Sequence, residues 1–131
     1  MKTFDNKDFE KYKAEALEKW GETDAYKEYA EKTKTYSKEQ WDSLAEGMDQ
    51  IMAKFAASMK TAEPPDSVQA QSLVKMLQCH ISENYYLCTN EILAGIGKMY
   101  VSDERFRKNI DKHADGTAEF ICEAVRVFCN R

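Results

Sequence analysis

One stretch decides the fold class: residues 37–59, with the sequence SKEQWDSLAEGMDQIMAKFAASM. It opens with a capping box, because the Ser37 hydroxyl oxygen can accept from a first-turn N–H while the Gln40 side chain reaches back to the helix start. The helix is expected to end before Pro64-Pro65, since proline disfavours a helical residue ahead of it. Apolar residues recur at spacings of three and four, which indicates one face of a long α-helix: Trp41, Leu44, Ala45, Met48, Met52, Phe55, Ala56 and Met59.

The residues that follow this segment also show helical periodicity. The expected helices cover about 67–84, 89–100, 103–112 and 117–129. Gly95 and Gly97 lie inside the second of these and lower its helix propensity, which indicates close approach of a neighbouring helix or a ligand. Residues that cap or precede these helices are Asp66 or Ser67, Thr89, Ser102 and Gly116.

The residues before Ser37 have weaker patterning. Helices are expected at about 7–20, ending at Gly21, and at about 23–33, capped by Thr23. Their apolar residues are sparse, so their order would depend on docking against the rest of the protein. Because no strand pattern occurs, the sequence predicts an all-α fold in a single domain, residues 1–131.

Composition limits the partners. The net charge is −4, with 43% hydrophobic and 32% charged residues, and no basic cluster stands out. Direct nucleic-acid contact and binding to an anionic membrane are therefore not expected. No apolar run is long enough for a membrane span, and the polar start of the sequence is unlike a signal peptide. We expect a cytoplasmic protein whose four cysteines are reduced thiols.

Cys88 has two readings. It stands just before the expected N-cap Thr89, where the positive end of the helix dipole would lower the thiol pKa and favour the thiolate, the form that attacks electrophiles. Glu91 in the first turn partly opposes this effect. The alternative is a buried, inert cysteine, and the sequence leaves both readings open.

Aromatic residues are numerous for this length. Tyrosine and tryptophan combine an apolar face with a polar tip, which suits a cleft for a large ligand of mixed polarity. The alternative is that most of them pack the core. The candidate ligand-binding residues are Cys88, Tyr85, Tyr86, Trp41, Tyr36, Trp20, His80 and Tyr100.

No constellation in the sequence favours catalysis, a cofactor or a metal. His80 adjoins Cys79, but adjacent helical residues do not face each other, and no further ligand spacing supports zinc. A haem ligated by His80 is a weak alternative. No phosphate-binding glycine loop or nucleophile elbow occurs. The many carboxylates are expected to lie on the solvent-exposed faces of helices. We expect a protein that is not an enzyme and binds no cofactor or metal.

Several stretches resemble one known family. They are 18–26 (EKWGETDAY), 36–41 (YSKEQW), 85–105, which contains Met99-Tyr100-Val101-Ser102-Asp103, and 106–125. Together they cover nearly the whole sequence in order. They resemble the TipAS antibiotic-recognition domain, the C-terminal half of TipA-like transcriptional activators of the MerR family.

The resemblance implies a globin-like core of about five helices without haem, at 37–131, and mobile N-terminal helices that act as a lid, at 1–36. It implies binding of thiopeptide-like or other bulky hydrophobic antibiotics, and a cysteine at the position of Cys88 that can add covalently to a dehydroalanine of the ligand. The protein would serve as the effector-sensing domain of a multidrug-responsive regulator or as a stand-alone drug-binding protein.

The sequence departs from the family's regulators because it contains neither the winged helix-turn-helix nor the coiled-coil dimerisation helix. We therefore expect a stand-alone version, an internal-start product or an excised domain. The alternative function, from another class, is a protein-interaction or dimerisation domain that controls a partner regulator, with weak homodimerisation through apolar surface.

Overall fold

The computed structural model describes residues 23–130, and the helix expected at 7–20, with Trp20, lies outside this range. No strand occurs between residues 23 and 130, so the all-α prediction is confirmed. No helix in the same range is long and apolar enough to cross a membrane. In sequence order the helices are α2 (Asp24–Thr33), α3 (Lys38–Lys60), α4 (Val68–Asn84), α5 (Asn90–Ser102), α6 (Glu104–Asp111) and α7 (Thr117–Cys129).

Most helix starts are those that the sequence predicts. Ser37 Oγ accepts from the Gln40 N–H at 3.2 Å, and Gln40 Oε1 accepts from the Ser37 N–H at 2.8 Å, which completes the capping box. Thr23, Ser67 and Thr89 each cap the following helix through a hydroxyl oxygen. These bonds satisfy N–H groups that have no partner within the helix, and so fix where α2 to α5 begin.

The cap predicted for the sixth helix is wrong by one residue. Ser102 is the last residue of α5, and its hydroxyl donates to the Lys98 carbonyl at 2.9 Å. Asp103 caps α6 instead, accepting from the Arg105 N–H at 3.0 Å and from the Arg105 guanidinium at 2.8 Å. Asp103 is preferred as the capping residue because the charge-assisted hydrogen bonds of a carboxylate are stronger than those of a neutral hydroxyl.

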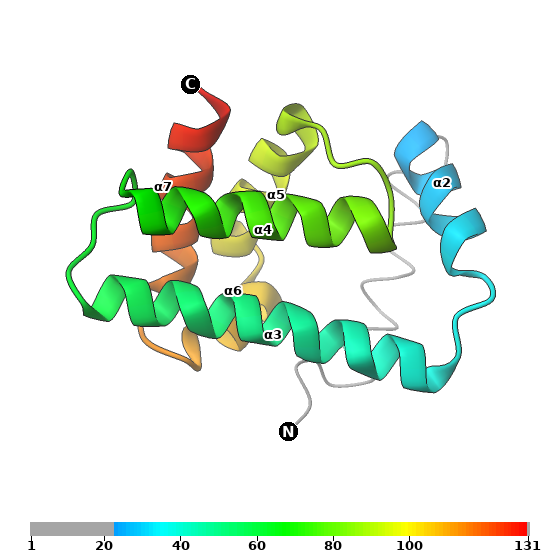
Figure 1. Ribbon diagram of the computed structural model, residues 1–131, viewed down its shortest axis with the longest axis horizontal. Coiled ribbons are helices and arrows are strands. Elements are labelled where there is room, and N and C mark those ends of the chain that lie inside the picture. The colour runs from blue at the N-terminus through cyan, green and yellow to red at the C-terminus, as the bar shows by residue number, and fades with distance from the viewer. Residues whose placement is uncertain (1–22, 131) are drawn as a thin grey trace.

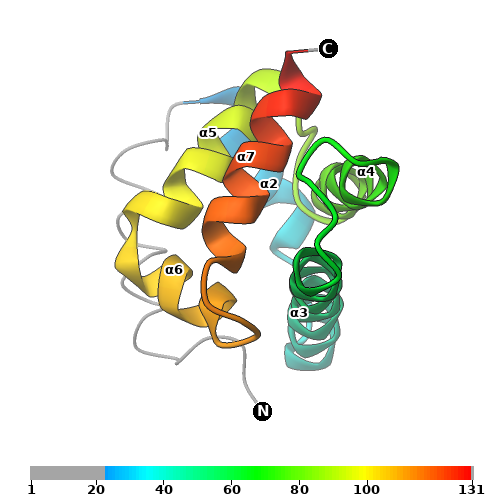
Figure 2. The same cartoon turned by 90° about the vertical axis from the view of Figure 1, so that its left-hand side faces the viewer.

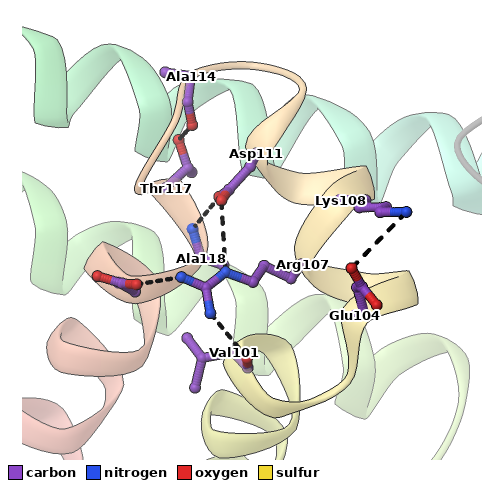
Figure 3. A network of polar contacts seen from close by, with 9 residues as sticks. Val101, Glu104, Arg107, Lys108, Asp111, Ala114, Thr117 and Ala118 are labelled. Atoms are coloured by element: carbon purple, nitrogen blue, oxygen red, sulfur yellow. Dashed lines mark hydrogen bonds and ion pairs between the residues drawn. The ribbon is translucent and has the colours of Figure 1, made fainter.

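The start of α7 is stabilised by the preceding helix. Its N-cap residue, Gly116, has φ 89° and no side chain that could cap. Asp111 at the end of α6 supplies the missing acceptor and takes the Ala118 N–H at 2.9 Å (Figure 3). Arg107 of α6 forms ion pairs with Asp111 and with Glu119 of α7. This network fixes the angle between α6 and α7.

The helices form two layers. Helices α3 and α4 run antiparallel side by side, and α5, α6 and α7 pack against one face of this pair and cross its direction (Figures 1 and 2). A Cβ at Gly97 of α5 would lie 3.2 Å from Val125 Cβ of α7, so the predicted close approach is confirmed there. Gly95 has nothing within 4 Å of such a Cβ. Side chains that are fully buried between the layers include Phe55, Val74, Leu77, Leu93, Ile121 and Val125.

Helix α2 occupies a separate position. It lies beside the end of the α3–α4 pair where α3 begins and α4 ends (Figure 1). Thr33 is its one buried residue. The apolar patterning of this helix is weak, and accordingly it contributes little to the core. It instead brings two tyrosines to the end of the α3–α4 pair.

Candidate ligand-binding site

An aromatic cluster joins α2, the first turn of α3 and the end of α4. Trp41 is at its centre, with ring centroids 5.5 Å from Tyr36, 6.2 Å from Tyr85 and 6.4 Å from Tyr29. The rings of Trp41 and Tyr85 are stacked, and Tyr36 meets Trp41 edge-on. These are the geometries that aromatic pairs prefer. We call this group the aromatic cluster, and its members are Tyr26, Tyr29, Tyr36, Trp41, His80 and Tyr85.

His80 closes the α4 side of the aromatic cluster. Its ring packs edge-on against Tyr85 at 6.0 Å, and a Cβ at Gly47 would lie 3.2 Å from its Cε1, so α3 comes close there. Burial lowers the pKa of His80, against a hydrogen bond with the Leu44 backbone and the charge of Glu83, which raise it. His80 Nε2 is buried without a hydrogen-bond partner among the described residues. A neutral imidazole is therefore available to a polar group that enters the cluster.

Two tyrosines of the cluster, Tyr29 and Tyr85, stay protonated at neutral pH. Burial raises the pKa of Tyr85 to about 12, and the neighbouring Tyr29 and Tyr36 add to the shift. Burial also raises the pKa of Tyr29, with a further contribution from Tyr26. At neutral pH Tyr29 and Tyr85 therefore each offer an uncharged hydroxyl beside an apolar face, which suits a ligand with amide and heterocyclic groups.

Polar contacts connect α2 and the segment that follows it to the residues around Cys88. Lys32 Nζ donates to the Ser82 carbonyl at 3.2 Å, and Tyr36 Oη donates to the Asn84 carbonyl at 2.5 Å. Glu28 Oε1 accepts from the Leu87 N–H at 3.0 Å. The first two bonds link the α2 side of the molecule to the end of α4, and the third links it to residues 85–89, which we call the Cys88 loop.

Cys88 itself is buried. Its side chain is 3% exposed and belongs to the hydrophobic core. Burial raises the pKa of the Cys88 thiol from 9.0 to about 11, and Cys129 of α7 adds to the shift. The expectation of a thiolate at a helix start is therefore wrong for this conformation, because the loss of solvent outweighs the helix dipole. The structure supports the other reading, a buried neutral thiol.

A pocket of about 400 Å³ adjoins the Cys88 loop on the α4 side. Its α4 residues recur at helical spacing along one face of that helix, and Leu87 and Cys88 complete the wall. Cys79 in this wall is an exposed free thiol. We call this hollow the thiol pocket, and its lining is Lys75, Gln78, Cys79, Ser82, Glu83, Leu87 and Cys88.

The predicted site residues that lie within residues 23–130, which are all of them except Trp20, divide into three groups. Trp41, Tyr36, Tyr85 and His80 meet in the aromatic cluster. Cys88 and Tyr86 lie in the Cys88 loop, where Tyr86 is half-buried against the core. Tyr100 is 5% exposed and packs against Phe106 at 5.7 Å, apart from the cluster.

Tyr26 and Tyr29 belong to the cluster, although sequence reasoning missed them as candidates. A signal for them exists. They are the two aromatic residues of a helix that is otherwise rich in charge, and their spacing of three places them on one face. Within residues 23–130, no group of three or more histidine, cysteine or acidic side chains is placed to hold a metal ion.

Comparison with known proteins identifies the family. Residues 12–128 match the model of the TipAS antibiotic-recognition domain. The chain belongs to this family. Its sequence is 38% identical over 125 residues to the HTH-type transcriptional activator TipA of Streptomyces coelicolor and to that of Streptomyces lividans, covering 95% of this chain and 49% of each activator. The chain thus spans about half the length of these relatives.

Two further matches agree with this assignment. The HTH-type transcriptional activator mta of Bacillus subtilis is 34% identical over 103 residues, which are 79% of this chain and 39% of the activator. A solved complex of nosiheptide with TipAS, from a thiopeptide antibiotic multidrug resistance system of Streptomyces lividans, matches with a TM-score of 0.87 and 37% identity. The match covers 98% of this chain and 90% of that one. The protein therefore has the globin-like TipAS fold that the sequence predicts.

Proposed function

We propose that this domain binds thiopeptide-like or other bulky hydrophobic antibiotics and acts as the drug-sensing part of a transcriptional regulator or as a stand-alone drug trap. The observation that supports this most is the aromatic cluster. Several rings and a neutral His80 meet between a thinly packed helix and the rest of the core, within the fold of a domain solved with nosiheptide. The site residues proposed are the cluster together with Cys88 and Tyr86.

Capture at Cys88 would be a conjugate addition. The sulfur forms a bond to the β-carbon of a dehydroalanine in the ligand, the π-electron pair moves to the α-carbon, and that carbon takes a proton. No group leaves and no oxidant is needed. Because the thiol is 3% exposed in this conformation, the Cys88 loop must open before the sulfur can reach a ligand.

The test is titration with a dehydroalanine-bearing thiopeptide, followed by binding measurement and intact mass. We expect saturable binding and a mass increase of one ligand, with the increase lost in Cys88→Ala. The exposed Cys79 provides the matched control, since Cys79→Ala should still form the adduct. Binding without a mass change would remove the covalent step alone. Absence of binding in the wild-type protein would refute the thiopeptide assignment.

The N-terminal lid belongs to the same proposal. Only Thr33 of α2 is buried, and the helix is attached mainly through rings and three hydrogen bonds from its side of the molecule. We propose that residues 1–36 open and close over the ligand. Amide hydrogen exchange at 24–33 should be faster than in α5 or α7 and should slow when ligand binds. Equal protection of α2 and α7 without ligand would argue against a lid.

One observation supports a second function, in protein interaction. Three large apolar side chains are exposed on α4 and the Cys88 loop, namely Val68 (80%), Met76 (41%) and Leu87 (64%). Such surface can hold a partner regulator or a second copy of the protein. Sedimentation over a range of concentrations separates the two cases, because a drug-binding monomer keeps a constant mass.

A further inference from the structure

The backbone of Cys88 is held at both of its polar groups by side chains of one helix. Its N–H donates to Ser82 Oγ at 3.1 Å, and its carbonyl accepts from Gln78 Nε2 at 2.9 Å. Gln78 and Ser82 are four residues apart on α4, so both point to the same side of that helix. We call this pair of contacts the clamp.

Each side of the clamp has further support. Gln78 Nε2 also donates to Asn90 Oδ1 at 2.9 Å, which ties it to the first residue of α5. The Ser82 carbonyl accepts from Lys32 of α2. Gln78 thus links the loop to both α4 and α5, and the Lys32 contact ties α2 to the backbone of α4 beside the clamp. Leu87, the residue before Cys88, is held at its N–H by Glu28 of α2, while its side chain is 64% exposed.

The clamp also borders the route to the thiol. Gln78, Ser82 and Cys88 all line the thiol pocket, and the Cys88 thiol packs into the core instead of into solvent. A ligand that entered this pocket would meet the amide of Gln78 and the hydroxyl of Ser82. These two groups could bond the amide carbonyls and N–H groups of a peptide-like ligand as well as they bond the Cys88 backbone.

We propose that Gln78 and Ser82 are positioning residues that keep the Cys88 thiol masked in the ligand-free domain, and that a ligand unmasks it by taking over their hydrogen bonds. This inference rests on the proposed function, because Cys88 is the capturing group there. It also explains how a buried thiol can select among electrophiles. Small electrophiles cannot displace the hydrogen bonds of the clamp, so they meet a sulfur that is still covered.

The size of the effect follows from the acidity of the thiol. Release would bring the pKa of Cys88 from about 11 back toward 9.0 and so increase the thiolate population. A less basic thiolate is also a weaker nucleophile, so the net gain in alkylation rate at about pH 8 is about tenfold. The titratable groups around Cys88 are Cys129, which adds to the raised pKa of its thiol, and Lys75, Cys79 and Glu83, which line the pocket beside it.

The experiment is alkylation of the full ligand-free protein by iodoacetamide, in which the sulfur displaces iodide and the thiol proton passes to solvent. Peptide mass spectrometry gives the rate at each cysteine. Gln78→Ala and Ser82→Ala should each raise the rate at Cys88 by about tenfold at about pH 8. They should also shift the midpoint of its pH profile downward, while exposed Cys79 changes little.

Matched variants separate the clamp from general destabilisation. Gln69→Ala and Ser72→Ala remove the same side chains from exposed positions of α4 and should leave the rate at Cys88 unchanged. Ser82→Thr keeps the hydroxyl and should restore slow alkylation. Cys122 is half-buried on α7 and reports opening of the whole fold. An unchanged or slower rate at Cys88, or equal acceleration of Cys122, would overturn the inference.

A thiopeptide arm distinguishes the two proposals. If clamp variants react faster with iodoacetamide but no variant forms an adduct with a dehydroalanine-bearing thiopeptide, the clamp stands and covalent capture fails. If the wild-type protein forms the adduct but the clamp variants do not change the rate with iodoacetamide, the function stands and the clamp fails.

Discussion

Helices α7 and α2 attach to the same core by different physical means. Helix α7 buries six side chains and meets α5 so closely that a Cβ at Gly97 would lie 3.2 Å from Val125 Cβ, a contact tighter than most. Helix α2 buries Thr33 alone, and aromatic rings and side-chain hydrogen bonds link it to its neighbours. The first kind of contact excludes water over a large area and is costly to separate. The second kind of contact can be exchanged for contacts to a ligand. The molecule therefore combines a firmly packed core, which includes α7, with a helix, α2, that can detach.

The largest expected effect is on the stability of the packed core. Leu93 is 0% exposed between α5 and its neighbours, so Leu93→Ala should lower the free energy of unfolding by about 3 kcal/mol, through lost apolar contact and a residual cavity. Urea denaturation measures it. Leu87→Ala, at an exposed leucine, is the matched control and should have little effect. A loss below about 1 kcal/mol at Leu93 would mean that the packed core around α5 is no firmer than the attachment of α2.

A change at the centre of the aromatic cluster should instead loosen the attachment of α2. Trp41→Ala removes three ring contacts and should lower the free energy of unfolding by about 1–2 kcal/mol. Amide exchange in 24–33 should accelerate much more than exchange in α7. Trp41→Phe keeps an aromatic ring, so its amide exchange in 24–33 should be intermediate between that of the wild-type protein and that of Trp41→Ala. Equal acceleration in α2 and α7 would show that the two regions unfold together.

The smallest effect concerns pH and again involves the cluster. Burial holds the pKa of His80 below its usual 6.5 in the folded state, so the unfolded protein binds a proton first as pH falls. The contribution to stability is therefore fully present well above pH 6.5, and it is lost as the pH falls through 6.5 toward the lower pKa of the folded state. The carboxyls of Asp49 and Asp103, whose pKa values lie below 3.8, remain charged over this range.

The test of this pH effect is urea denaturation at both ends of the range. His80→Gln should flatten the dependence because glutamine does not titrate. His113→Gln is the matched control, since it leaves the buried ring of His80 in place. A pH dependence that survives in His80→Gln would assign the effect to another group.

Local sequence signals were sufficient for the starts of four helices, α2 to α5. Caps at Thr23, Ser37, Ser67 and Thr89 were predictable because a hydroxyl acceptor and the N–H it serves are three residues apart. Choosing Ser102 over Asp103 failed because Arg105, which favours the carboxylate, adds a bond that a capping rule does not include. The capping of α7 by Asp111 was missed because the acceptor lies in the preceding helix.

The candidate site was predictable only in part. Trp41, Tyr36, Tyr85 and His80 were chosen for their chemistry, and the fold brings them together from three segments. Tyr29 was missed because its helix looks solvated in isolation. Tyr100 has the same chemistry but lies in the core beside Phe106. Residue type therefore indicated which side chains could contact a ligand, and packing decided which of these rings lie together.

The sequence by itself determined the all-α class, the starts of α2 to α5 and the family, because these depend on residues that are near neighbours in sequence or on motifs read in order. The tertiary structure alone decided the state of Cys88. A helix start favours a thiolate through the dipole of nearby peptide groups, but burial raises the pKa of the Cys88 thiol to about 11. Burial depends on which distant segments cover the sulfur, and no local pattern encodes that.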